Sequence, residues 1–162
     1  MNNIAKRLAV IGLAGALATT GAMIADSEGY VPGTYIDPVG IITACFGHTS
    51  KELKLGVVMS DQQCLELLAK DLVNHNQQLL SAVNVPLSEQ EHAAYLSFHY
   101  NVGAANFRSS TLLKYLNAGS RVEACNQLTR WVYARGVKLN GLIKRRSHER
   151  DLCLSGVLNG QH

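Results

Sequence analysis

An uncharged run of 18 residues, Leu8 to Ala25, stands near the start of the chain. Eleven of these residues are Gly, Ala or Thr, so the run is only weakly apolar. As one continuous helix it would be about 27 Å long, slightly less than the ~30 Å hydrocarbon core of a bilayer. Lys6 and Arg7 precede the run, whereas acids follow it, which favours insertion with the N-terminus inside and the rest of the chain outside.

Capping residues followed by apolar positions at helical spacing predict the main helices. A helix starts at Ser60 and reaches about Leu80, and a second starts at Ser88 and ends before Gly103. The first helix carries leucines near one face, at Leu65, Leu68, Leu72 and Leu79. Similar signals predict further helices over residues 110–117, 120–134 and 141–154.

Between the run and these helices, a β-hairpin is predicted over residues 34–46. Asp37-Pro38-Val39-Gly40 has the sequence of a type I turn, with Pro at the second position and Gly at the fourth. A simple four-residue turn would pair Thr34 with Thr43 and place Asp37 on the opposite face from Thr43. The predicted fold class is therefore α+β, with a small β-hairpin lobe, a larger helical lobe and a cleft between them.

The length and charge of the chain narrow its class. At 162 residues it can form one compact domain with a real core. The net charge is +3, and seven Lys or Arg residues against one acid, Glu149, lie between Arg130 and Arg150. Such a stretch suits nucleic acid, a membrane surface or an anionic wall polymer, but it is also typical of a solvated helix face.

Four cysteines, Cys45, Cys64, Cys125 and Cys153, lack the C-x-x-C spacing of zinc or thioredoxin-like sites. In a cytosolic protein they would be buried thiols, and in an exported protein two disulfides are expected. Cys45 with Cys64 and Cys125 with Cys153 are plausible partners from their places on the predicted elements. Four cysteines allow three pairings, and the sequence does not select one.

The stretch from Glu28 to Thr49, EGYVPGTYIDPVGIITACFGHT, carries the candidate chemistry. Glu28 and Asp37 are its only acids. Two carboxyl groups set apart among apolar and small residues suggest general acid and base work on a neutral substrate, in which one holds a proton and the other does not.

These residues also resemble the catalytic signature of the phage-type lysozymes, the endolysins that cut bacterial peptidoglycan. The signature comprises Glu28, Asp37 and Thr43, followed by Gly47-His48-Thr49. Further similar motifs cover roughly residues 26–155: FHYNVG at 98–103, NF at 106–107, RW at 130–131 and GLIKRR at 141–146.

The resemblance implies a lysozyme-like fold and a muramidase that hydrolyses the β-1,4 bond between N-acetylmuramic acid and N-acetylglucosamine, without cofactor or metal. Glu28 would be the general acid, and Asp37 would stay ionised to stabilise the transition state or activate water that Thr43 helps to hold. The family is regarded as inverting, which predicts carboxyl groups roughly 6.5–9.5 Å apart. Host cell lysis would be the role, with peptidoglycan as the partner and a monomer as the working form.

Further site residues follow from the same resemblance. His48 is expected to form an ion pair with Asp71 that joins the two lobes. The residues expected to bind the saccharide are Tyr100, Asn101, Arg145 and Arg146. Trp131, the only Trp, suits core packing better than sugar stacking.

For the N-terminal run, three interpretations remain open. It could be a cleaved signal peptide, since Ala16-Leu17-Ala18 has the form of a cleavage site. It could be a permanent anchor, which its weak hydrophobicity disfavours. It could also be a signal-arrest-release segment, as in endolysins of lambdoid phages, which leaves the bilayer uncleaved because Gly and Ala forfeit little apolar burial.

The third interpretation divides the chain into a release segment, residues 1–25, and a catalytic domain, residues 26–162. The export machinery would insert the protein, residues 8–25 would tether it to the inner membrane facing the periplasm, and release would free it there. Residues 1–44 contain no cysteine, so control by thiol exchange is not supported.

Three other functions compete with the muramidase. A wall-binding module without activity is disfavoured by the presence of Glu28, Asp37 and Thr43. A membrane-tethered nucleic-acid-binding protein is excluded if the chain is exported, so no nucleic-acid partner is expected. A transglycosylase with the same fold would leave an anhydro product, whereas Asp37 with Thr43 favours hydrolysis.

Overall fold

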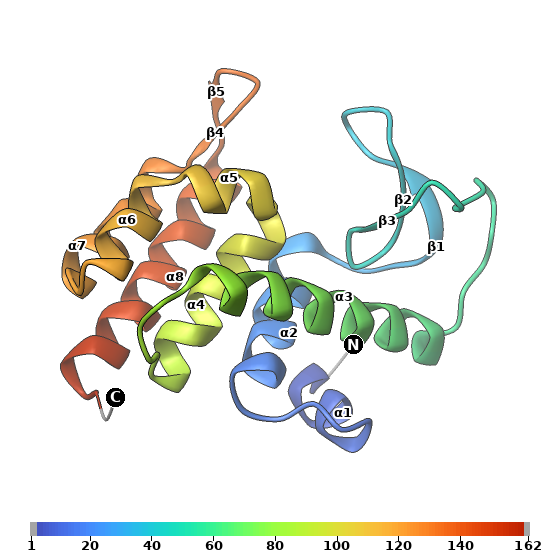
Figure 1. Cartoon of the computed structure of the whole chain (residues 1–162). Coiled ribbons are helices and arrows are strands. Elements are labelled where there is room, and N and C mark those ends of the chain that lie inside the picture. The colour runs from blue at the N-terminus through green and yellow to red at the C-terminus, as the bar shows by residue number, and fades with distance from the viewer. Residues whose placement is uncertain (1–2, 161–162) are drawn as a thin grey trace. The chain divides into compact units, whose positions relative to one another are not determined.

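The computed structural model describes residues 3–160 of the chain. The chain divides into unit 1, Met1–Val73, and unit 2, Asn74–His162. The division falls within helix α3 (Asp61–Ala82), which is drawn in green in Figure 1. Each unit has its own buried core, and each is described separately below.

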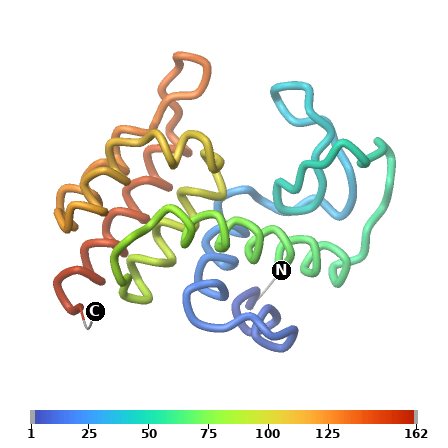
Figure 2. The backbone as a smooth tube through the Cα atoms, in the orientation of Figure 1, coloured from blue at the N-terminus to red at the C-terminus, as the bar shows by residue number. Residues whose placement is uncertain are grey.

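The N-terminal run forms parts of two helices in unit 1, α1 (Ile4–Val10) and α2 (Gly15–Glu28). The single helix considered for residues 8–25 is therefore wrong for this structure. The chain leaves the helical conformation after Val10, where Gly12 has φ +98°, and it reverses direction before α2, as Figure 2 shows. Among the described residues, no helix is both long and apolar enough to cross a membrane.

The small residues of the run allow α1 to pack closely on α2. A methyl group placed on Gly21 would lie 2.1 Å from Leu8 Cδ1 and 3.3 Å from Leu72 Cδ1. Leu8 and Ile24 are fully buried. In this structure the run thus supplies core residues of unit 1.

Three strands follow in one antiparallel sheet, in the order β1 (Val31–Ile36), β2 (Ile42–Cys45) and β3 (His48–Thr49). The type I turn is confirmed by the hydrogen bond from Gly40 N to Asp37 O. The predicted register is wrong by one residue, because Thr43 pairs with Tyr35 and not with Thr34. Gly40, at φ +85°, adds a left-handed residue after the turn and so lengthens the loop to three residues.

Helix α3 begins as its capping residues predict. Gln63 N donates to Ser60 Oγ, and Ser60 N donates to Gln63 Oε1, which completes a capping box. The four predicted leucines are all buried: Leu65, Leu68, Leu72 and Leu79.

Unit 2 is mainly helical. Helix α4 (Glu89–Val102) packs along α8 (Asn140–Leu158), as Figure 1 shows. The capping box of α4 is present, since Ser88 Oγ accepts from Glu91 N and Glu91 Oε2 accepts from Ser88 N. The shorter elements are α5 (Ala104–Ser109), α6 (Thr111–Asn117), α7 (Arg121–Gln127) and the 3-10 turn η1 (Leu128–Arg130).

The helix predicted through residue 134 is wrong, because α7 ends at Gln127. The chain then forms a short hairpin of β4 (Tyr133–Ala134) and β5 (Val137–Lys138). Arg135 and Gly136, at φ +50° and +75°, form its two-residue loop. Positive φ at both loop positions is typical of a type I′ hairpin turn, which a helix cannot contain.

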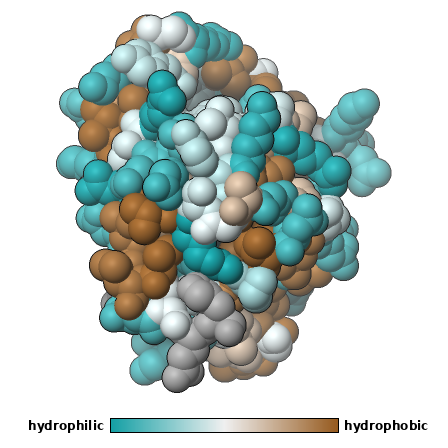
Figure 3. Space-filling view, turned by 60° about the vertical axis from the view of Figure 1, so that its left-hand side comes forward, coloured by the Kyte–Doolittle hydropathy of each residue, from teal (hydrophilic) through white to brown (hydrophobic). Residues whose placement is uncertain are grey.

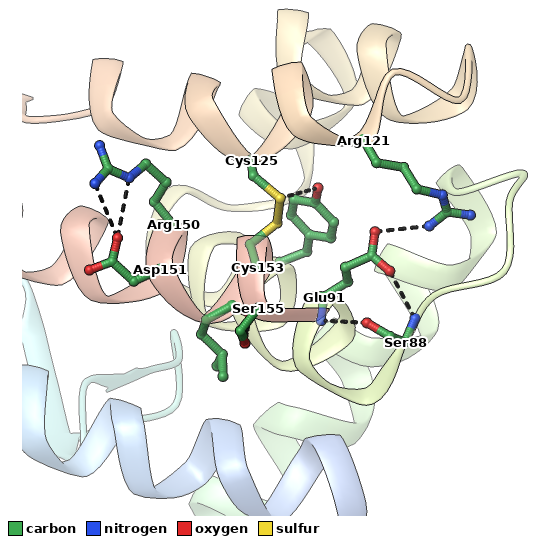
Figure 4. Close-up of a disulfide and its surroundings, with 10 residues drawn as sticks. Ser88, Glu91, Arg121, Cys125, Arg150, Asp151, Cys153 and Ser155 are labelled. Carbon is green, nitrogen blue, oxygen red and sulfur yellow. Dashed lines mark hydrogen bonds and ion pairs between the residues drawn. A yellow bond between two sulfur atoms is a disulfide. The ribbon is translucent and has the colours of Figure 1, made fainter. Parts of the chain in front are cut away.

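Two disulfides are present, Cys45–Cys64 in unit 1 and Cys125–Cys153 in unit 2. They are the two pairs that were plausible from the predicted elements. Figure 4 shows Cys125 of α7 joined to Cys153 of α8, with the ion pair between Arg121 and the buried Glu91 to one side of the bridge. The bridge therefore fixes α7 to α8.

Candidate active site

Glu28 is the last residue of α2, and its side chain is half-buried. A methyl group placed on Gly47 would lie 3.5 Å from Glu28 Oε2, so the Gly-His-Thr segment runs close to this carboxyl group. Glu28 therefore lies where α2 ends and the Gly-His-Thr segment passes.

Asp37 occupies the first position of the hairpin loop. Its Oδ1 accepts hydrogen bonds from Val39 N at 2.9 Å and from Ile41 N at 2.8 Å. These two donors hold one oxygen of the carboxyl group in a defined position. Asp37 is also half-buried.

The observed register changes the expected relation between Asp37 and Thr43. Tyr35 pairs directly with Thr43, so these side chains share one face of the hairpin. Asp37 follows Tyr35 by two residues and therefore emerges on the same side as Thr43. The expectation that the two lie on opposite faces is wrong because it assumes the shorter loop.

Tyr35 lies near both candidate acids, and it was not predicted as a site residue. Burial raises the pKa of Tyr35, and the negative charges of Glu28 and Asp37 raise that pKa further. Both carboxyl groups are thus within electrostatic reach of one phenol. In the sequence, Tyr35 stands two residues before Asp37. With the correct hairpin register, this spacing would have placed Tyr35 on the same face as Asp37 and Thr43.

Thr43 is 3% exposed, and its Oγ1 donates to Ile41 O at 3.2 Å. A hydroxyl oxygen that donates its own hydrogen still has lone pairs that can accept from water. Thr43 can therefore help to orient a water molecule on the face that it shares with Tyr35.

His48 on β3 and Asp71 on α3 are in direct contact. The Nδ1 atom of His48 lies 2.9 and 2.7 Å from the two carboxylate oxygens of Asp71. Both side chains are 16% exposed, and both belong to unit 1. With the Cys45–Cys64 disulfide, this pair gives the sheet two attachments to α3.

In unit 2, the residues expected to bind the saccharide belong largely to a buried polar network. Arg146 is fully buried and donates to Glu149, to Asn101 Oδ1 and to Trp131 O. Arg145 is 7% exposed and donates to Glu149 Oε1 at 3.2 Å. Direct saccharide contact by Arg146 does not fit this burial, and its contacts indicate that it positions Asn101.

Two of the seven cations between residues 130 and 150 therefore neutralise the internal Glu149 and do not contribute to a surface patch. Arg150 is paired with Asp151 at 3.1 Å. The remaining exposed cations are Arg130, Arg135, Lys138 and Lys144. The face in Figure 3 mixes hydrophilic and apolar groups over its surface.

A pocket of about 360 Å³ in unit 2 lies beside this network. Asn101 and Trp131 contribute to its wall, together with Tyr133 of the β4–β5 hairpin. Trp131 also packs edge-on against the buried Phe98, with ring centroids 5.3 Å apart. Tyr100 is half-buried, and its ring centroid lies 4.9 Å from that of His75.

Among the described residues, no three or more His, Cys, Asp or Glu side chains gather as a metal site would require. The chemical resources of unit 1 are instead two carboxyl groups, a phenol and a threonine hydroxyl near one sheet face. A protonated and an ionised carboxyl group together suit hydrolysis of a glycosidic bond.

Comparison with known families decides the class of the protein. The phage lysozyme family model matches residues 25–149, which include every candidate catalytic residue. This chain belongs to the phage lysozyme family. It is a muramidase, a glycoside hydrolase that cuts bacterial peptidoglycan in host cell lysis.

Individual relatives agree with the family. The SAR-endolysin of bacteriophage PS119 is 45% identical over 129 residues, covering 80% of this phage lysozyme and 77% of the relative. The SAR-endolysin of Enterobacteria phage P21 is 42% identical over 150 residues, or 88% and 90% of the two chains. The active form of the P1 phage endolysin Lyz has a similar structure, with a TM-score of 0.80 and 25% identity over 97% of each chain. The lysozyme-like α+β fold predicted from the sequence is thereby confirmed.

Proposed function

We propose that Glu28 is the general acid of this muramidase and that it protonates the glycosidic oxygen between N-acetylmuramic acid and N-acetylglucosamine. Asp37, on the same face of the hairpin as Thr43, stabilises the positive charge that develops on the sugar or activates a water molecule. Thr43 orients that water. The observation that carries this proposal is geometric: the pairing of Tyr35 with Thr43 brings Asp37 and Thr43 to one face of the hairpin, and the segment after β2 runs beside Glu28 at Gly47.

The hydrogen bonds of Asp37 support its part in the proposal. Two backbone N–H groups hold Oδ1, so the carboxylate is oriented before the substrate binds. An oriented negative charge stabilises an oxocarbenium-like transition state without reorganisation during the reaction. The family's inverting mechanism and the carboxyl separation of roughly 6.5–9.5 Å remain predictions.

In unit 2 we assign saccharide contact to Tyr100 and Asn101, and a supporting role to Arg145 and Arg146. Asn101 is exposed and lines the pocket, while its Oδ1 is held by the buried Arg146. The arginines therefore act through the residues that they hold and not by touching the sugar.

Exchange of the two acids tests the catalytic assignment. Glu28→Gln and Asp37→Asn should each lower the rate of peptidoglycan solubilisation at least about 100-fold, since each removes a charge or proton used in the transition state. Glu52→Gln, an exposed residue of the same unit, should leave the rate unchanged. Activity within about twofold of the parent in Glu28→Gln, in a folded protein, would contradict the assignment.

For the N-terminus we propose that residues 1–25 are a signal-arrest-release segment and that residues 26–162 are the catalytic domain. The names of the PS119 and P21 relatives support this proposal. The export machinery would insert residues 8–25 into the inner membrane, and the protein would work as a monomer in the periplasm after release. The packing of α1 on α2 supports the proposal, because it gives residues 8–25 a place in the folded unit 1.

Cell fractionation tests the proposed release. Before depolarisation the full-length chain should sediment with the inner membrane, and after depolarisation it should appear in the periplasm with its N-terminal residues intact. A shortened chain in the periplasm would indicate cleavage of a signal peptide. A chain that remains in the membrane fraction would indicate a permanent anchor.

A further inference from the structure

Tyr30 follows the proposed general acid by two residues, across Gly29, and is held on two sides. Its ring stacks on Phe46, with centroids 5.0 Å apart and planes 29° from parallel. Its hydroxyl donates to Asp61 Oδ1 at the start of α3. Phe46 is 2% exposed and directly precedes Gly47, which runs beside the Glu28 carboxyl group. Tyr30 therefore links the end of α2 both to the segment that runs beside Glu28 and to the start of α3.

Asp61 has a second partner in the N-terminal helix. Arg7 Nη1 of α1 lies 3.7 Å from Asp61 Oδ2, while Oδ1 of the same carboxylate accepts from Tyr30. One carboxylate thus joins α1 to the residue that anchors the end of α2.

We infer that Tyr30 is a positioning residue for Glu28 and that Arg7 supports this role through the Asp61 carboxylate, which accepts from the Tyr30 hydroxyl. The inference rests on the proposed role of Glu28. In the released protein, Arg7 orients the Asp61 carboxylate, the carboxylate holds the Tyr30 hydroxyl, and Tyr30 fixes the chain that leaves Glu28.

The two contacts of Asp61, with Tyr30 and with Arg7, should contribute differently to the turnover rate. The hydrogen bond from Tyr30 to a charged acceptor is of the stronger kind, whereas the ion pair with Arg7 is weakened by solvent. Arg7 and Asp61 are 36% and 55% exposed. Loss of the Tyr30 hydroxyl should therefore reduce the turnover rate more than loss of Arg7.

Steady-state kinetics of the full-length, detergent-free protein on soluble uncrosslinked peptidoglycan strands test the inference. Tyr30→Phe keeps the ring stacked on Phe46 and removes only the hydroxyl, so kcat should fall about fivefold while KM stays unchanged. Arg7→Gln should lower kcat about twofold. Tyr115→Phe, an equivalent exchange on α6, is the control and should change neither constant.

The double variant distinguishes a relay through Asp61 from two independent effects. If Arg7 acts only through Tyr30, Arg7→Gln should lower kcat no further in a Tyr30→Phe background. If the reduction in kcat of the double variant equals the product of the two single reductions, the coupling of Arg7 to Tyr30 through Asp61 is overturned. An unchanged kcat in Tyr30→Phe, or a change confined to KM, would overturn the positioning role.

Asp61→Asn is a second route to the same test if Tyr30→Phe does not fold. The amide oxygen can still accept from Tyr30 but no longer pairs with a cation, so kcat should equal that of Arg7→Gln. A kcat equal to that of the parent would overturn the relay. A failure of the proposed role of Glu28 is distinguished from a failure of this inference by the Glu28→Gln variant, which would then remain active.

Discussion

At the scale of single residues, the site depends on side chains that hold backbone segments as well as on those that react. His48 and Asp71 attach β3 to α3 through contacts of 2.9 and 2.7 Å. Thr43 lies on β2, which pairs with β3, and Glu28 lies beside Gly47, which directly precedes His48. A residue such as Asp71 can therefore control stability without taking part in the reaction.

Asp71→Asn should lower the free energy of unfolding by about 1.5–3 kcal/mol, the usual worth of a hydrogen bond to a charged group. The muramidase rate at temperatures where the variant is folded should remain close to that of the parent. Thermal unfolding measured beside activity, with the exposed Asp26→Asn as a control, makes the comparison. Lost activity with unchanged stability would contradict the structural role of Asp71.

His99 provides a second prediction at this scale. The side chain is fully buried, its Nδ1 lies 2.8 Å from His75 Nδ1, and its Nε2 has no hydrogen-bond partner among residues 3–160. Burial lowers the pKa of His99 to about 4, with smaller contributions from His75 and Arg108. Because the unfolded chain titrates near ~6.5, it binds the proton first as the pH falls.

The contribution of neutral His99 to the free energy of unfolding is complete above about pH 6.5. It decreases by up to about 3 kcal/mol as the pH falls toward 4. Urea unfolding at pH 7 and pH 4.5 measures this loss. His99→Leu should show a smaller decrease over the same interval, because it removes the group that is protonated on unfolding. An equal decrease in both proteins would exclude His99 as its source.

At the scale of secondary-structure elements, the composition of the N-terminal run suits both its proposed release from the bilayer and its packing in unit 1. Its small residues make it weakly apolar, which suits an escape from the bilayer. The same small residues let α1 pack on α2, since Leu8 occupies the space that a side chain at Gly21 would need. The composition of the run is therefore explained by packing as well as by membrane affinity.

Gly21→Ala tests this packing. Alanine is favoured over glycine in a helix by about 1 kcal/mol, so propensity alone predicts stabilisation. The added methyl group would meet Leu8 Cδ1, and we expect net destabilisation of about 1–2 kcal/mol. In a Leu8→Ala background the same exchange should be harmless, and a rise in Tm for Gly21→Ala alone would contradict the close packing.

At the scale of the whole molecule, the sequence predicts the features that depend on local chemistry. The starts of α3, α4 and α6 follow from capping by Ser60, Ser88 and Ser110. The motif from Glu28 to Thr49 indicates the family through the identity and spacing of its residues. These signals lie within a few residues of the features that they predict.

The features that were not predicted depend on one residue or on distant partners. Gly40 adds one residue to the hairpin loop and so moves Asp37 to the side of Thr43. Arg146 looks like a surface cation in sequence, but Glu149 and Asn101 hold it inside unit 2. Neither fact follows from spacing alone, because each depends on the three-dimensional arrangement.

Mass spectrometry of the muropeptides released from purified peptidoglycan tests the central claim most directly. The detergent-free parent protein should release fragments with reducing N-acetylmuramic acid ends, and Glu28→Gln should release none. Anhydro-muramic ends would show a transglycosylase and contradict hydrolysis assisted by Asp37 and Thr43. Reducing ends from a folded Glu28→Gln protein, in the amount that the parent produces, would contradict the assignment of Glu28 as the acid.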